Sequence, residues 1–128
     1  MSRHDIRKKA FELLFAQQIN DYIPEELVAI NEDFEEQEID AGVKELFLNT
    51  LLHKEEFDGI IESLSKKRSI ARMPKSVVSI LRLALYEIKY DEKVPTSVAI
   101  SEAVLLAKDY CDEGDVSFIN GLLGNFAR

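Results

Sequence analysis

The sequence is poor in several residue types: it has no tryptophan, one cysteine, three prolines and five glycines among 128 residues. Glycine and proline mark the turns of β folds, so their scarcity favours an all-α protein. The single cysteine, Cys111, cannot form an internal disulfide, which is typical of a reducing compartment. No run reaches the roughly 18 apolar residues of a membrane span, and no signal segment precedes the body. We therefore expect a cytoplasmic protein.

Histidine is also scarce, which argues against a metal centre or a catalytic site. His53 and Glu56 lie three residues apart on one helix face, but this pair falls short of the three or four ligands of a zinc site. The sequence has no GxSxG motif, no phosphate-binding glycine loop and no CxxC motif. The acidic run 32–40 lacks the alternating pattern of a calcium loop. We expect neither an enzyme nor a bound cofactor.

Charge is distributed unevenly along the chain, whose net charge is −8. Residues 20–62 hold fourteen acidic side chains and only two cations, Lys44 and Lys54. Basic side chains collect instead at residues 3–9 and in the connector 66–75. This segregation can present a local cationic surface on an acidic body, and solvated helix ends and a linker are the alternative.

Helical periodicity is nearly continuous and predicts seven helices. The helix KSVVSILRLALYEIKY is apolar nearly all round, which predicts a place at the centre of a bundle. We expect one all-α domain of two small helical bundles, 1–65 and 76–128, joined by the basic connector 66–75. The seven helices are expected over about 4–20, from Pro24, over about 36–53, in the segment outlined by Phe57, Ile60, Ile61 and Leu64, from Pro74, from Pro95 and Thr96, and over FINGLLGNFAR with Asp115 or Ser117 as its cap.

The first helix combines cations with aromatic rings. On a helical wheel a core stripe lies beside a mixed arc of roughly 100°. Cations for phosphates and flat rings for unpaired bases are what recognition of single-stranded RNA requires. About four cations predict weak binding, near ~10⁻⁴–10⁻⁶ M, that a second protein would have to strengthen. The arc consists of His4, Arg7, Lys8, Phe11, Phe15 and Gln18.

Core contact is the alternative for the two phenylalanines of this arc. The wheel favours the core for Phe11 and leaves both readings open for Phe15. The connector 66–75 has two readings as well, because it either contacts RNA or is solvated.

Three stretches match one family in order and spacing: IRKKAFELLFAQQ at 6–18, ILRLALYEIKYDEKVPTSVAISEAVLLAKDY at 80–110 and FINGLLGNF at 118–126. The chain resembles the NusB family of bacterial transcription antitermination factors, weakly across 20–62 and strongly from residue 80 onward. The resemblance implies an all-α, seven-helix fold and a heterodimer with the ribosomal protein NusE bound to boxA RNA. This assembly would join the RNA polymerase elongation complex with other Nus factors and promote transcription of ribosomal-RNA operons. No cofactor, metal or catalysis is implied.

The resemblance also implies functional positions. Arg3, Arg7 and Phe15 match the amino-terminal RNA-binding motif of the family, whereas His4 stands where several relatives have an arginine, which predicts a gentler salt dependence. Phe118 and Asn120 match the motif that begins the last helix, where a ring beside an amide can stack on a base and read it. Core contact is the alternative for Phe118. The expected RNA-binding residues are Arg3, His4, Arg7, Lys8, Phe15, Phe118 and Asn120.

Three further charged residues lie in apolar helices. Glu87 matches a position that the resemblance associates with the partner-protein surface. Arg82 and Glu102 are expected to form a mutual buried pair, since an unpaired charge there would be costly.

Two other functions stay open: a protein-only interaction module or homodimer, and a regulatory domain for a ribosomal-RNA methyltransferase carried on a separate chain. The second arises because the same helical module resembles the amino-terminal domain of certain ribosomal-RNA cytosine methyltransferases. The sequence also leaves the oligomeric state open.

Overall fold

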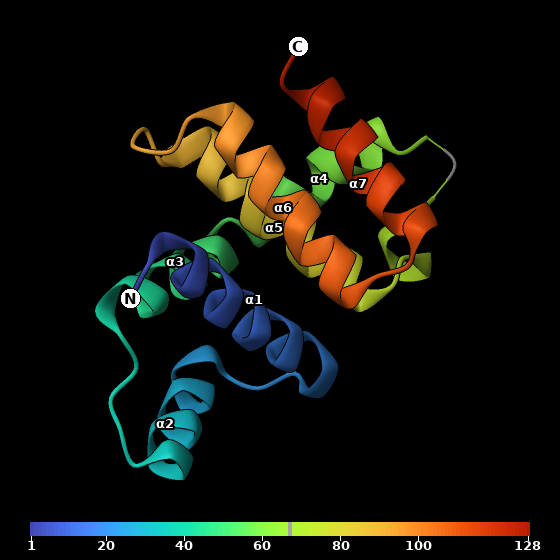
Figure 1. The fold of residues 1–128 in the computed structure, drawn as a ribbon. Coiled ribbons are helices and arrows are strands. Elements are labelled where there is room, and N and C mark those ends of the chain that lie inside the picture. Colours follow the sequence, from blue (N-terminus) through green and yellow to red (C-terminus); the bar gives the residue numbers. More distant parts are fainter. Residues whose placement is uncertain (67) are drawn as a thin grey trace.

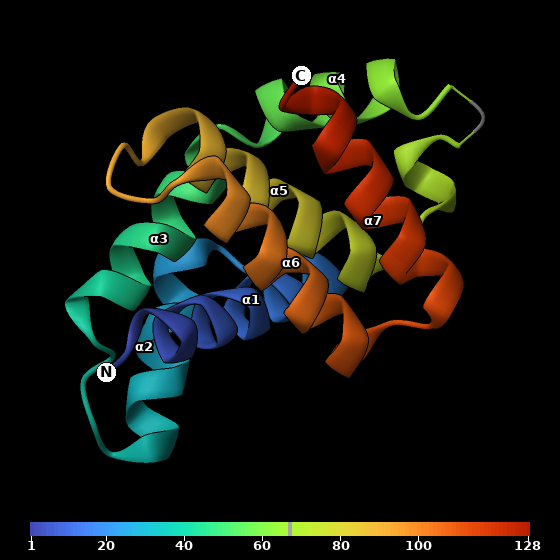
Figure 2. The same ribbon diagram turned by 45° about the horizontal axis from the view of Figure 1, so that its top comes forward.

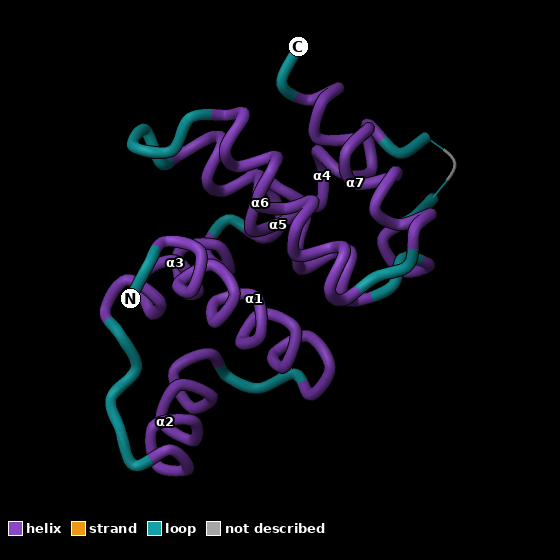
Figure 3. The backbone as a smooth tube through the Cα atoms, viewed as in Figure 1, coloured by secondary structure: helices purple, strands orange, loops and turns teal. Residues whose placement is uncertain are grey.

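A computed structural model of the chain describes residues 1–66 and 68–128. These residues form seven α-helices and one short 3-10 helix and contain no strand, which confirms the all-α, seven-helix prediction (Figures 1 and 3). Lys67, one of the connector cations, lies outside the described residues. The elements are α1 (Arg3–Asn20), α2 (Pro24–Glu35), α3 (Ala41–Leu52), α4 (Lys54–Leu64), η1 (Ile70–Arg72), α5 (Lys75–Tyr90), α6 (Thr96–Tyr110) and α7 (Glu113–Phe126).

Two helices begin at other residues than predicted, because side-chain caps decide their starts. Glu36 adopts a left-handed conformation, with φ of 54°, and ends α2. The following α3 begins after Asp40, whose Oδ1 accepts a hydrogen bond from the Gly42 N–H at 2.8 Å. Asp112 caps α7 by accepting from the Asp115 N–H at 2.9 Å, so this helix begins before both predicted caps.

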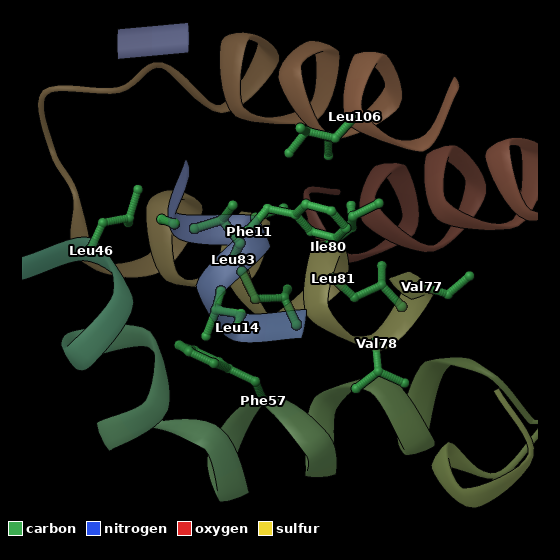
Figure 4. Packing of buried hydrophobic residues seen from close by; sticks show 14 of the residues in the cluster. Phe11, Leu14, Leu46, Phe57, Val77, Val78, Ile80, Leu81, Leu83 and Leu106 are labelled. Atoms are coloured by element: carbon green, nitrogen blue, oxygen red, sulfur yellow. The ribbon is translucent and has the colours of Figure 1, made fainter. Parts of the chain in front are cut away.

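The apolar helix α5 lies at the centre of the molecule, as predicted. It contacts α1, α3, α4, α6 and α7. Figure 4 shows Phe11 of α1, Phe57 of α4 and Leu106 of α6 among the side chains that surround it. Because five helices bury surface on it, α5 is apolar on nearly every side.

The helices form two groups (Figures 1 and 2). In one group α1 packs against α2 and α3, and in the other α6 packs against α7. Both groups contact α5. The predicted boundary at residues 65 and 66 stays a prediction, and α4, which precedes it, packs against α5 and α7. No helix within the described ranges combines the length and the apolar character that crossing a membrane would need.

The predicted pair of Arg82 and Glu102 is wrong. Arg82 is buried, but its guanidinium donates from Nε to Asp58 Oδ1 and from Nη2 to Asp58 Oδ2, both at 2.8 Å. Glu102 instead bonds His4 of α1, at 2.8 Å. The reason is the orientation of the helices: this side chain of α5 faces α4, whereas Glu102 of α6 faces α1.

Glu56 joins α4 to the carboxyl end of α5. It accepts hydrogen bonds from Lys89 and, at 2.6 Å, from the Tyr90 hydroxyl. The bond from Lys89, followed by that from Tyr90, holds the pKa of Glu56 below its ordinary value of 4.5. A carboxylate with a lowered folded-state pKa adds stability above its unfolded pKa and loses it as pH falls through the folded value. The bonds of Glu56 therefore stabilise the fold at neutral pH.

We expect the free energy of unfolding to decrease as pH falls below about 4.5, and Glu56→Gln to remove part of this decrease. Urea unfolding followed by circular dichroism between neutral pH and about pH 3 measures it. Glu62→Gln is the matched control, because Glu62 is exposed on the same helix. Identical pH profiles for the two variants would contradict the assignment.

Candidate RNA interface

The amino-terminal end of α1 places basic side chains against carboxylates of α5, of the turn that follows α5, and of α6. Arg3 Nη2 lies 2.9 Å from Asp91 Oδ2 and 3.7 Å from Glu87 Oε2. His4 Nδ1 lies 2.8 Å from Glu102 Oε2. The side chains of Arg3 and His4 are still about half exposed, at 54% and 48%. These two predicted RNA contacts thus lie on the surface, next to acidic groups of the same chain.

Arg7 and Glu87 form a buried ion pair between α1 and α5. Arg7 Nε donates to Glu87 Oε1 at 2.8 Å and to Oε2 at 2.9 Å, and the two side chains are only 5% and 2% exposed. Burial raises the pKa of Glu87 above its ordinary value, and the hydrogen bonds from Arg7 act in the opposite direction. The side chain of Arg7 is therefore not accessible to RNA in this structure, and the side chain of Glu87 is not accessible to a partner protein. Both residues join helices instead.

The arc predicted on the first helix is largely the face that packs on α5 and α6. Phe11 is buried, and its ring centroid lies 4.6 Å from that of Tyr110. Gln18 Nε2 donates to Ser79 Oγ at 2.8 Å and to the Lys75 carbonyl at 3.0 Å. Together with the pairs of His4 and Arg7, these contacts show that the polar members of the arc other than Lys8 have polar partners within the fold. A helical wheel alone does not reveal such partners.

Two residues of the arc remain accessible. Lys8 is exposed and forms no ion pair with any described residue. Phe15 is half-buried, and its ring stacks on that of Phe11 with centroids 5.9 Å apart and an interplanar angle of 14°. Phe11 thus belongs to the core, as the wheel favoured, whereas Phe15 lies at the boundary between core and solvent.

The two predicted residues of α7 point in different directions. Phe118 is half-buried under the Arg68 guanidinium, which lies 4.6 Å from the ring centroid and 3.8 Å from the Asp115 carboxylate. Asn120 is exposed. Residues two apart on an α-helix are separated by about 200° around its axis. A ring and an amide so placed face different directions on the helix, and their contacts with RNA stay a prediction.

Two hollows open near these groups. One, of about 250 Å³, lies beside Arg3, where α1, α3 and α5 meet, and its lining is both aromatic and charged. Sequence reasoning missed it because its residues come from distant segments. The other, of about 520 Å³, lies at the junction of α6 and α7. The first is lined by Arg3, Ile6, Arg7, Gly42, Glu45, Leu46, Tyr86, Glu87, Tyr90, Asp91 and Lys93, and the second by Lys108, Cys111, Glu113, Val116 and Ser117.

The predicted RNA-binding residues therefore form two groups, one on α1 and one on α7. Arg3, His4, Lys8 and Phe15 are accessible to different degrees on α1, while Phe118 and Asn120 lie on α7, and α6 lies between the two helices (Figures 1 and 2). In the part of the chain that the structure covers, no three or more His, Cys, Asp or Glu side chains are grouped so as to hold a metal ion.

Comparison with known proteins identifies similar sequences along nearly the whole chain. A model of the NusB family matches residues 4–128. A protein of Lacticaseibacillus casei, named transcription antitermination protein NusB, is 38% identical over 128 residues, which cover 99% of this chain and 95% of that protein. The family model thus covers the acidic segment 20–62 as well.

Solved structures share the fold. NusB of T. maritima has a TM-score of 0.86 and 28% identity, and the match covers 99% of this chain and 91% of that one. One chain of a crystal structure of the antitermination factors NusB and NusE in complex with dsRNA has a TM-score of 0.82 and 27% identity, over 98% of this chain and 96% of that one.

Proposed function

The chain belongs to the NusB family, and from that premise we propose that it is a transcription antitermination factor that binds boxA RNA as a heterodimer with the ribosomal protein NusE. In this proposal it acts in the cytoplasm with the RNA polymerase elongation complex and other Nus factors, and it promotes processive transcription of ribosomal-RNA operons. The protein is a regulatory factor and not an enzyme, as the names of its relatives indicate.

One observation carries the proposal: the similarity extends over the entire fold. A relative named as an antitermination protein is 38% identical over 99% of the chain. A chain crystallised with NusE and RNA matches 98% of it at a TM-score of 0.82. The match also covers 95% of the antitermination protein of Lacticaseibacillus casei, so the similarity is to a factor of this size and not to one domain of a long enzyme.

We place the RNA on the exposed face at the start of α1. Arg3 and His4 are half exposed and Lys8 is exposed, so all three reach solvent, unlike Arg7. Two cations and a histidine, with Arg3 and His4 next to carboxylates, support only weak binding of phosphates. This charge balance favours a mechanism in which NusE supplies further contacts.

A titration of labelled boxA RNA, with and without saturating NusE, tests the proposal. We expect a Kd in the range ~10⁻⁴–10⁻⁶ M for the chain alone and at least about tenfold tighter binding with NusE. Lys8→Gln should weaken binding about two- to threefold, because it removes one phosphate contact. Lys54→Gln is the matched control, because Lys54 is an exposed cation on α4.

Equal affinities with and without NusE would overturn the cooperative mechanism. No RNA binding in either titration, with NusE still bound, would favour the protein-only interaction module.

A further inference from the structure

We propose that Asp91 and Glu102 lower the affinity of this chain for RNA, because they occupy Arg3 and His4 and an RNA phosphate must displace them. The inference rests on the proposed function and adds to it the two residues that set how weakly the chain binds without help. Neither acidic residue was among the predicted RNA contacts.

The geometry of the two pairs supports this role. Arg3 Nη2 donates to Asp91 Oδ2 at 2.9 Å, and His4 Nδ1 lies 2.8 Å from Glu102 Oε2. The two basic side chains are 54% and 48% exposed, whereas the acidic ones are 22% and 19% exposed. The basic partner of each pair is thus the one that can turn toward a ligand in solvent.

The carboxylates have other contacts that hold them in place. Asp91 Oδ1 also accepts from the backbone N–H of Lys93 at 3.1 Å, in the turn after α5. Glu102 also lies 4.0 Å from Nη1 of the buried Arg7. Both acidic groups therefore stay beside the binding surface when Arg3 or His4 moves. A phosphate that binds there gains a cation but lies close to a remaining negative charge.

This neutralisation extends along the start of α1. Besides Arg3, His4 and Arg7, Lys9 is paired as well, because its Nζ lies 3.1 Å from Glu35 Oε1. Among the basic side chains of residues 3–9, Lys8 alone forms no ion pair with another described residue. The cationic segment that the sequence displays is therefore nearly neutral in the folded chain.

The test uses Asp91→Asn, Glu102→Gln and the double variant, each bound to NusE and titrated with labelled boxA RNA at two salt concentrations. Each single variant should bind RNA about two- to fivefold more tightly, since an exposed ion pair typically changes an equilibrium constant by that factor. The double variant should gain about tenfold. The slope of log K against log salt should steepen by about 0.7 for each cation released, as for one more phosphate of a single strand.

Two controls separate this effect from other causes. Glu62→Gln changes the net charge equally on the exposed face of α4, and it should leave affinity and slope nearly unchanged. Charges farther away than about 8 Å are largely screened at physiological salt. In an Arg3→Gln background, Asp91→Asn should tighten binding much less, because most of its effect acts through Arg3. Circular dichroism confirms that every variant is folded.

The inference would be overturned if the Asp91 and Glu102 variants bind RNA like Glu62→Gln, or more weakly than the unmodified chain. In that case the proposed function still holds as long as the unmodified chain binds RNA in a NusE-dependent way. A full gain that persists in the Arg3→Gln background would also overturn it. Loss of RNA binding by the unmodified chain with NusE bound would remove both proposals together.

Discussion

Arg7→Met should lower the free energy of unfolding by about 3–5 kcal/mol, because it removes both hydrogen bonds to the buried carboxylate of Glu87 and leaves it only Arg3, 3.7 Å away, as a cationic neighbour. Glu87 is 2% exposed, and Arg7 donates to both of its oxygens. Urea unfolding followed by far-ultraviolet circular dichroism measures the change, since the chain has no tryptophan for fluorescence. A loss of this size is a large part of the 5–15 kcal/mol that typically separates folded from unfolded domains.

The pH dependence of this loss identifies its cause. Burial already raises the pKa of Glu87, and removal of Arg7 takes away the hydrogen bonds that oppose this shift. A carboxylate whose pKa is raised in the folded state stabilises the fold below its unfolded pKa and loses that contribution as pH rises through the folded value. The deficit of Arg7→Met should therefore shrink as pH falls.

The double variant Arg7→Met with Glu87→Leu should regain most of the lost stability, because apolar residues of similar volume often replace a buried ion pair without loss. Lys8→Met, at an exposed neighbouring position, should change stability by less than about 0.5 kcal/mol. If Arg7→Met costs no more than Lys8→Met, the pair does not stabilise the fold. A stable double variant that binds RNA normally would exclude the RNA contact predicted for Arg7.

Phe11→Ala should cost about 3–5 kcal/mol of stability, the usual range for removing a buried phenylalanine. The Phe11 side chain is 1% exposed, and it packs between the rings of Phe15 and Tyr110. Its removal leaves a cavity between α1 and α6. Chemical denaturation of the purified variant gives the value directly.

Phe15→Ala is the comparison, and it should cost less than half as much because this side chain is only half-buried. Equal losses for the two variants would show that both rings belong to the core to the same extent. Because we expect Phe15→Ala to stay folded, its titration with boxA RNA resolves the alternative that the sequence left open. A base stacked on this ring would contribute about 1–3 kcal/mol.

The positions of the helices along the chain were predictable because short-range signals in the sequence specify them. Pro74 and Pro95 directly precede α5 and α6, and Pro24 lies in the first turn of α2, where a missing N–H is not needed. The continuous apolar surface of α5 predicted its central position correctly. The start of α3 was predicted too early, because the left-handed conformation of Glu36 and the cap at Asp40 are local choices that periodicity does not record.

The sequence by itself determined the all-α class, the number of helices and the central helix, because apolar periodicity and proline positions act within a few turns. Only the tertiary structure decided the partner of each charged side chain. Arg7 and Glu87 are 80 residues apart in the chain, and His4 and Glu102 are 98 apart. A charge in an apolar stretch indicates that it needs a partner, but which carboxylate it meets depends on how the helices pack against one another.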